Sequence, residues 1–210
     1  ENRPDDRIGL VIFSGESFTQ CPLTTDHTVL KNLFSSVKTG MVQDGTAIGM
    51  GLATAVSRLK DSKAKSKVVI LLTDGVNNSG SIAPELAADL ARPFGIRIYT
   101  IGVGTKGMAL SPVNIYPNGQ YVYDYVKVDI DESVLKKISN ATGGKYFRAT
   151  DNAKLKAIYA EIDKMEKTII EEKQYSRKAE LFHPLAIAAF VLLIIEFLLK
   201  NTVFKTITGY

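Results

Sequence analysis

Short apolar runs alternate with segments of helical periodicity along the first 165 residues. The largely apolar runs fall at residues 8–13, 68–72 and 97–103, and a short segment with the character of a last strand follows at 145–149. Between them, apolar residues recur every three or four positions in residues 26–37, 48–60, 81–95 and 131–143. Such runs predict buried strands, and a spacing near 3.6 residues predicts amphipathic helices. The alternation of the two predicts an α/β fold with a Rossmann-like parallel sheet, in which the unbroken run at 68–72 is buried on both faces.

Two segments predict antiparallel hairpins instead. Residues 8–13 are followed by a Ser-Gly-Glu-Ser turn and a second short run at 18–21. Later, Pro117-Asn118-Gly119 supplies turn residues within 108–128, a region without a helical pattern. Tyr121, Tyr123 and Tyr125 alternate there, which predicts one face of an edge hairpin. This tyrosine row is either a contact surface or packing over the edge of a sheet.

The C-terminal segment differs in kind from the rest. All eleven residues from 185 to 195 are apolar, and Leu181–Leu199 is interrupted only by His183, Pro184 and Glu196. A helix of this length matches a hydrocarbon core of about 30 Å. We therefore predict a transmembrane helix at 181–199 rather than a buried core helix. The resulting organisation is a domain at 1–165, a charged helical linker at 166–180, the membrane helix, and a short basic tail at 200–210.

Composition excludes several classes of function. The chain of 210 residues has a net charge of +4, with its Lys and Arg dispersed among acids. No basic stripe with interleaved aromatic residues is present, so we expect no nucleic-acid partner. Cys21 is the single cysteine, and His27 and His183 lie far apart in the sequence. Internal disulfides and cysteine-based zinc sites are therefore excluded.

The strongest candidate site combines a carboxylate and a hydroxyl. Asp74 directly follows the run at 68–72 and Thr73, and Thr46 precedes the helix predicted at 48–60. Strand–helix junctions of a parallel sheet gather at one edge, where ligands bind. Carboxylate and hydroxyl oxygens suit Mg²⁺ or a similar hard cation. The residues expected to shape the two loops are Asp44, Gly45, Thr73 and Gly75. The alternatives are that Asp74 only starts a turn and that Thr46 or Asp44 caps the helix.

Five segments together resemble the von Willebrand factor type A (VWA) domain family, and more narrowly the membrane-anchored bacterial aerotolerance (Bat) proteins. They are residues 6–27, 44–60, 66–80, 95–104 and 142–168. The resemblance implies a metal-ion-dependent adhesion site (MIDAS) built from a D-x-S-x-S loop, a separate Thr and the Asp of a T-D-G loop. The last two fall on Thr46 and Asp74. The D-x-S-x-S motif is absent from this chain. Asp131-Glu132-Ser133 comes nearest, but Leu135 stands where the second Ser is required.

The missing motif leads to an expectation about the fold. In the family, the D-x-S-x-S loop follows a central strand. We therefore expect a VWA fold that lacks its first strand and helix, with a gap between the strands at 8–13 and 68–72. The Mg²⁺ site would be complete only if the longer protein supplies the loop. We expect the 210-residue chain on its own to fold poorly.

The resemblance implies binding rather than catalysis. It implies a metal-dependent module that binds protein partners, namely other Bat proteins and a MoxR-type AAA ATPase system, in envelope or oxidative-stress tolerance. It also implies the bacterial inner membrane and favours a periplasmic domain, whereas the basic residues before 181 favour the cytoplasm. The alternatives are a metal-independent membrane scaffold and a Mg²⁺-dependent phosphohydrolase. The latter would need an aspartyl nucleophile, such as that of a D-x-D motif, at the same strand end, and neither Asp74 nor Thr46 belongs to such a motif.

Overall fold

The computed structural model describes residues 5–104, 107–117, 119–128, 130–179 and 182–202. It divides into two units, Glu1–Ile162 and Asp163–Tyr210. The strands of the first unit are β1 (Ile8–Phe13), β2 (Ser17–Thr24), β3 (Lys67–Thr73), β4 (Ile96–Val103), β5 (Gly107–Ile115), β6 (Tyr121–Val128) and β7 (Tyr146–Ala149). Its helices are α1 (His27–Ser35), α2 (Ile48–Leu59), α3 (Pro84–Ala91), the 3₁₀ turn η1 (Arg92–Phe94) and α4 (Glu132–Ala141). Helix α5 (Asn152–Ala179) begins in the first unit, and α6 (Phe182–Thr202) lies in the second.

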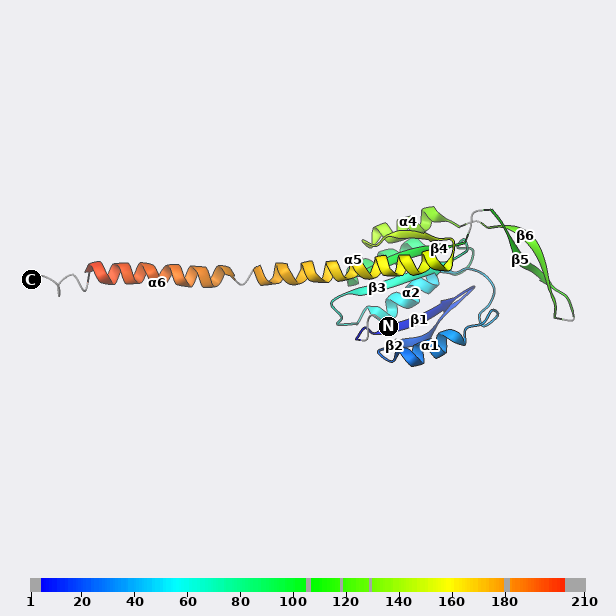
Figure 1. Cartoon of the computed structure of the whole chain (residues 1–210), viewed down its shortest axis with the longest axis horizontal. Coiled ribbons are helices and arrows are strands. Elements are labelled where there is room, and N and C mark those ends of the chain that lie inside the picture. The colour runs from blue at the N-terminus through cyan, green and yellow to red at the C-terminus, as the bar shows by residue number, and fades with distance from the viewer. Residues whose placement is uncertain (1–4, 105–106, 118, 129, 180–181, 203–210) are drawn as a thin grey trace, which may run out of the picture. The chain divides into compact units, whose positions relative to one another are not determined.

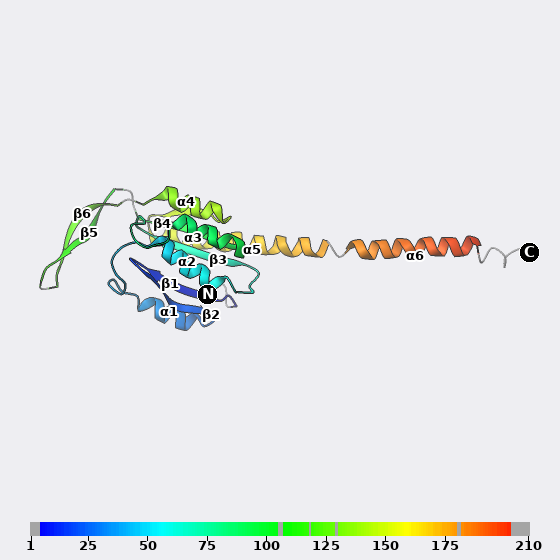
Figure 2. The ribbon, with the colours of Figure 1, turned by 180° about the vertical axis from the view of Figure 1, so that it is seen from behind.

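A parallel sheet in the order β3-β4-β7 forms the centre of the first unit. Its register pairs Val69 with Ile98 and Ile101 with Phe147. Helices α2 and α3 lie over one face, and the first part of α5 lies over the other (Figures 1 and 2). Strand β4 is in the middle, and six of its eight residues are buried. The predicted α/β fold with a parallel sheet is confirmed.

Strands β1 and β2 form a separate antiparallel hairpin, with α1 beside it (Figure 1). Among the described residues, β1 pairs only with β2, and the outer edge of β3 has no strand beside it. The sheet is thus divided where the sequence predicts a gap. Strand β2 is longer than the predicted run at 18–21 and pairs with the whole of β1, apart from two irregularities of register.

The predicted burial of residues 68–72 on both faces is wrong. Val69 and Leu71 point into the core, whereas Ile70 is 36% and Leu72 is 40% exposed. The physical reason is one-sided helix packing. Helix α2 packs against one face of β3, and among the described residues no helix packs as closely against its other face.

Strands β5 and β6 form the predicted antiparallel hairpin. Tyr121, Tyr123 and Tyr125 are all more than half exposed, and the rings of the first two lie 6.4 Å apart. They therefore do not pack over a sheet edge within the described part of the chain. The other interpretation, a contact surface, stays a prediction. Asn118 of the predicted turn lies outside the described residues.

Helix boundaries follow local capping chemistry. The Asp26 carboxylate accepts hydrogen bonds from the first turn of α1, and Asp131 does the same for α4. Helix α3 begins at Pro84 rather than at the predicted Ser81, because proline suits the first helical position. The left-handed Gly95 ends the turn that follows α3, as predicted.

In the second unit, α6 contains 21 residues, and its described side chains from Leu185 to Leu199 are almost all exposed. Within the portion of the chain that the structure describes, no helix has both the length and the apolar character needed to cross a membrane. Leu181 and residues 203–210 of the predicted basic tail lie outside the described residues.

Candidate functional site

A groove of about 320 Å³ lies at the carboxyl ends of β1 and β3. Thr46 and Asp74 both line it, so the structure brings the two predicted ligands to one hollow. Gly45 and Thr73, two of the predicted loop residues, line it as well. Its other walls are apolar and come from β1, β3 and the end of α1: Leu10, Val11, Ile12, Phe13, Phe34, Val37 and Leu72, with Ser14 at the polar end.

Gly75 permits the close approach of the two loops. A Cβ atom at Gly75 would stand 3.0 Å from the Thr46 Oγ1 atom, which is tighter than ordinary side-chain contacts. The Gly75 amide in turn donates to Thr73 Oγ1 at 3.3 Å. A side chain in place of Gly75 would therefore crowd the Thr46 hydroxyl that lies beside the T-D-G loop.

Two asparagines fix the position of the Thr46 loop. The Thr46 amide donates to Asn78 Oδ1 and the Ile48 amide donates to Asn77 Oδ1, each at 2.8 Å. The Asn78 amide donates back to the Thr46 carbonyl at 3.0 Å. The loop after β3 thus holds the loop before α2 by its backbone. Sequence reasoning missed both residues, because adjacent asparagines after a strand indicate only a turn and do not reveal a distant partner.

The helix-cap alternative for Thr46 and Asp44 is wrong. The N-cap of α2 is Ala47, which makes no side-chain cap bond, and Asn77 satisfies the Ile48 amide instead. Asp44 does not line the groove; its carbonyl lies against Gly15, where a Cβ atom would approach it to 2.6 Å.

Ser14 joins β1 to the same site and was also missed. Its hydroxyl donates to the Gly45 carbonyl at 2.9 Å, and its own carbonyl accepts from the Ala47 amide at 2.6 Å. The Ser14–Gly45 contact places the end of β1 beside the loop that holds Thr46. A Ser-Gly turn between two strands gave no sequence signal beyond a hairpin.

Asp74 and Thr46 can supply part of the coordination shell of a cation. The Asp74 side chain is exposed and forms no ion pair with any described residue, so its carboxylate is available. The Thr46 hydroxyl supplies a second oxygen. Mg²⁺ requires six ligands in near-octahedral geometry, so further oxygens must come from water or other residues. Nowhere in the described part of the chain do three His, Cys, Asp or Glu side chains gather in a metal-binding group.

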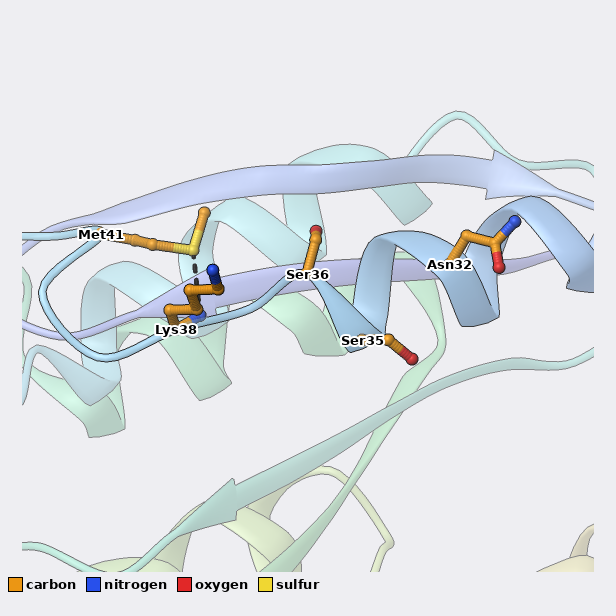
Figure 3. A pocket seen from close by; sticks show the side chains of 5 residues that line it. All are labelled: Asn32, Ser35, Ser36, Lys38 and Met41. Carbon is orange, nitrogen blue, oxygen red and sulfur yellow. Dashed lines mark hydrogen bonds between the residues drawn. The ribbon is translucent and has the colours of Figure 1, made fainter.

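A larger, open hollow of about 640 Å³ lies at the C-terminal end of α1. Figure 3 shows its lining, which consists of Asn32, Ser35, Ser36, Lys38 and Met41. The Lys38 amide donates to Met41 Sδ at 3.2 Å across it. No carboxylate, histidine or thiol lies in this lining, so the Thr46–Asp74 groove is the better candidate for ligand chemistry.

The model of the von Willebrand factor type A domain family matches residues 1–161. The chain belongs to the VWA family. A relative from Borreliella burgdorferi, an uncharacterized protein, is 28% identical over 205 residues, which cover 98% of this chain. The VWA chain spans 60% of the length of that relative.

Solved structures that are similar to this chain include Bat proteins. The hypothetical protein BatB from Bacteroides thetaiotaomicron superposes with a TM-score of 0.63 at 29% identity, covering 78% of this chain and 80% of its own. An aerotolerance-related membrane protein from Bacteroides fragilis gives 0.61 at 27% identity, covering 76% and 80%. The mussel byssus protein PTMP1, solved with a zinc-occupied MIDAS motif, gives 0.51 at 27% identity, covering 69% and 31%. The VWA domain described above is thus similar to Bat membrane proteins and to a metal-binding VWA protein.

Proposed function

We propose that this VWA domain binds a partner protein through a divalent cation held by Asp74 and Thr46. The observation that carries the proposal is that both side chains line one groove, where Gly75 leaves room for the Thr46 hydroxyl. The Asp74 carboxylate would neutralise part of the charge, and Thr46 would add a neutral oxygen. The remaining protein ligands would come from a D-x-S-x-S loop, which is not among these 210 residues. A partner carboxylate would then complete the shell.

Binding rather than catalysis fits the groove. Apolar side chains make up most of its lining, and its polar groups are hydroxyls and one carboxylate. The one carboxylate of the lining, Asp74, is assigned to the cation, which leaves no second acid or base for the proton transfers of a phosphohydrolase among these lining residues. The similarity to PTMP1 with zinc in its MIDAS motif supports the cation part of the proposal.

We further propose that α6 anchors the domain in the bacterial inner membrane, with the VWA domain in the periplasm. The exposed apolar side chains from Leu185 to Leu199 support this, because such a surface is unfavourable in water. The Bacteroides fragilis neighbour is described as an aerotolerance-related membrane protein. By that analogy, the partners would be other Bat proteins and a MoxR-type AAA ATPase system in stress tolerance.

The test uses the full-length protein from the source organism, immobilised in detergent, with the native membrane extract as the source of partners. Asp74→Ala should abolish Mg²⁺-dependent capture of its partner while thermal stability without metal is unchanged, since Asp74 is exposed. Thr46→Val should weaken capture in the same way. Asp61→Ala, which removes an exposed acid of another loop, is the matched control and should capture as the wild type does.

Direct metal binding separates the proposal from the scaffold alternative. Titration of the full-length protein with Mn²⁺, followed by electron paramagnetic resonance, should show one site that is lost in Asp74→Ala. Partner capture that is equal with and without chelator would contradict the proposal. It would favour a metal-independent scaffold.

A further inference from the structure

The basic residues are less evenly dispersed among acids than expected, because the net charge of the protein is concentrated in one segment. Residues 58–67 contain five basic residues and one acid, a net charge of +4 that equals that of all 210 residues. The segment begins in the last turn of α2 and ends at Lys67, the first residue of β3. The remaining charges of the chain therefore cancel, and this lysine-rich loop is the basic feature that stands out.

Three lysines of the loop have no structural task. Lys60, Lys63 and Lys65 are exposed, and their ammonium groups form no ion pair with any described residue. Some lysines elsewhere in the first unit are paired with acids. Lys136 lies 3.3 Å from Glu132, and Lys145 lies 2.7 Å from Glu161.

The backbone of the loop is nevertheless held in place. Ser62 is the central contact, because its hydroxyl accepts from Arg7 and from the Ala64 amide, each at 3.3 Å. Lys67 Nζ donates to the Lys60 carbonyl at 3.0 Å and closes the loop. The free ammonium groups thus project from a defined turn rather than from a loose tail.

The loop lies at the amino edge of the sheet, opposite the candidate cation site. It precedes β3, whereas Asp74 follows β3. The chain also leaves the first unit at this edge. Lys145 directly precedes β7, and its ion pair with Glu161 places the last turn of α5 in that unit beside the start of β7.

We propose that Lys60, Lys63 and Lys65 bind the phosphate groups of anionic phospholipids in the membrane that α6 enters. This rests on the proposed membrane anchoring. Lysine is a compact, flexible point charge that suits a diffuse anionic surface. The loop contains no aromatic side chain for stacking on bases, so a single-stranded nucleic acid would find only half of its usual binding features.

The proposal has a consequence for the dependence on salt. Attraction between exposed charges decays over a Debye length of about 8 Å at physiological salt and about 3 Å at 1 M. Contact between the loop and anionic lipid must therefore weaken as salt is added.

The experiment measures this contact by energy transfer in nanodiscs. The full-length protein carries Ala64→Cys with a donor dye, and an acceptor dye is on the lipid headgroups. Cys21 is buried and does not compete for the label. Transfer should be high with 30% phosphatidylglycerol. Addition of 0.5 M NaCl should lower it to the level seen with pure phosphatidylcholine. Lys60→Gln, Lys63→Gln and Lys65→Gln together should reduce the equilibrium constant for surface contact about tenfold or more.

The matched control neutralises three exposed lysines on α4 and α5: Lys137→Gln, Lys154→Gln and Lys156→Gln. It has the same change of net charge, and its transfer should stay as in the wild type. Equal transfer in both lipids, or an equal loss in both triple variants, would overturn the inference. Retention on phosphatidylcholine nanodiscs through a high-salt wash tests membrane anchoring separately, so failure of the anchor is distinguishable from failure of the loop.

Discussion

The two parts of the divided sheet differ in how much they bury. In residues 8–35, which form β1, β2 and α1, Cys21 is the single buried side chain. In the other part, β4 alone contributes six buried residues, and α2, α3 and α4 add their apolar faces to the same core. Burial of apolar surface is the main source of stability. The β3–β4–β7 region therefore carries the fold, and the β1–β2–α1 region depends on it.

The candidate cation site lies where these two regions meet. Asp74 and Thr46 belong to the well-buried region, whereas Ser14 and most of the apolar groove wall belong to β1 and α1. A strand between β1 and β3 would pair both open edges. The same event would therefore stabilise the sheet and shape the site.

A matched pair of core truncations tests the comparison most strongly. Ile98→Ala in β4 should lower the free energy of unfolding by about 2–5 kcal/mol, since Ile98 is fully buried. Ile12→Ala in β1 should lower the free energy of unfolding by about 1 kcal/mol or less. Ile12 is only partly buried, so less of its apolar surface leaves water on folding. Urea unfolding followed by circular dichroism measures both. Equal losses would show that the two regions contribute alike.

Packing of α2 against the loop before α3 gives a second test. A Cβ atom on Gly49 of α2 would collide with the Ile82 carbonyl, and backbone cannot rotate away as a side chain can. Gly49→Ala should therefore push α2 from the loop before α3 and lower the free energy of unfolding by about 1–3 kcal/mol. Ser57→Ala, on the exposed face of the same helix, should change it by less than about 0.5 kcal/mol. A neutral Gly49→Ala would mean that this loop yields easily.

Two helix caps with the same geometry sharpen the comparison further. Asp26 Oδ1 accepts two amide hydrogen bonds at 3.0 Å in α1, and Asp131 Oδ1 accepts two at 3.1 and 3.0 Å in α4. Loss of either cap costs about 0.5–2 kcal/mol of helix stability. Asp131→Ala should show this in global unfolding, because α4 packs in the core. Asp26→Ala should instead raise amide hydrogen exchange within α1, with a smaller global effect.

The smallest expected effect concerns acid. The Lys154 amide, and after it the Thr150 hydroxyl, hold the pKa of Asp151 below its ordinary value of 3.8. A carboxylate with a lowered pKa stabilises the folded state above about pH 4, and this contribution is lost as the pH falls through the folded-state pKa. Asp151→Asn keeps an acceptor for Lys154 but removes the charge. Its unfolding midpoint should depend less on pH between 5 and 2.5 than that of the wild type.

The sequence by itself determined the order and type of the elements. Periodicity predicted the strands of the parallel sheet and its helices, and the aspartates at positions 26 and 131 predicted two helix starts correctly. These features depend on neighbouring residues, so they can be read locally. The pairing of Thr46 with Asp74 was predicted from their positions at strand–helix junctions.

Only the tertiary structure decided the one-sided burial of β3, the exposure of the hairpin tyrosines, and the role of Asn77 and Asn78 in holding the Thr46 loop. Burial depends on which elements lie opposite a residue, and no local pattern contains that information. Thr46 fits a helix cap equally well by sequence, until Asn77, some thirty residues away, takes the cap position. Asn77 satisfies the Ile48 amide, a donor that a capping Thr46 hydroxyl would have served, and Thr46 Oγ1 lies beside the T-D-G loop instead.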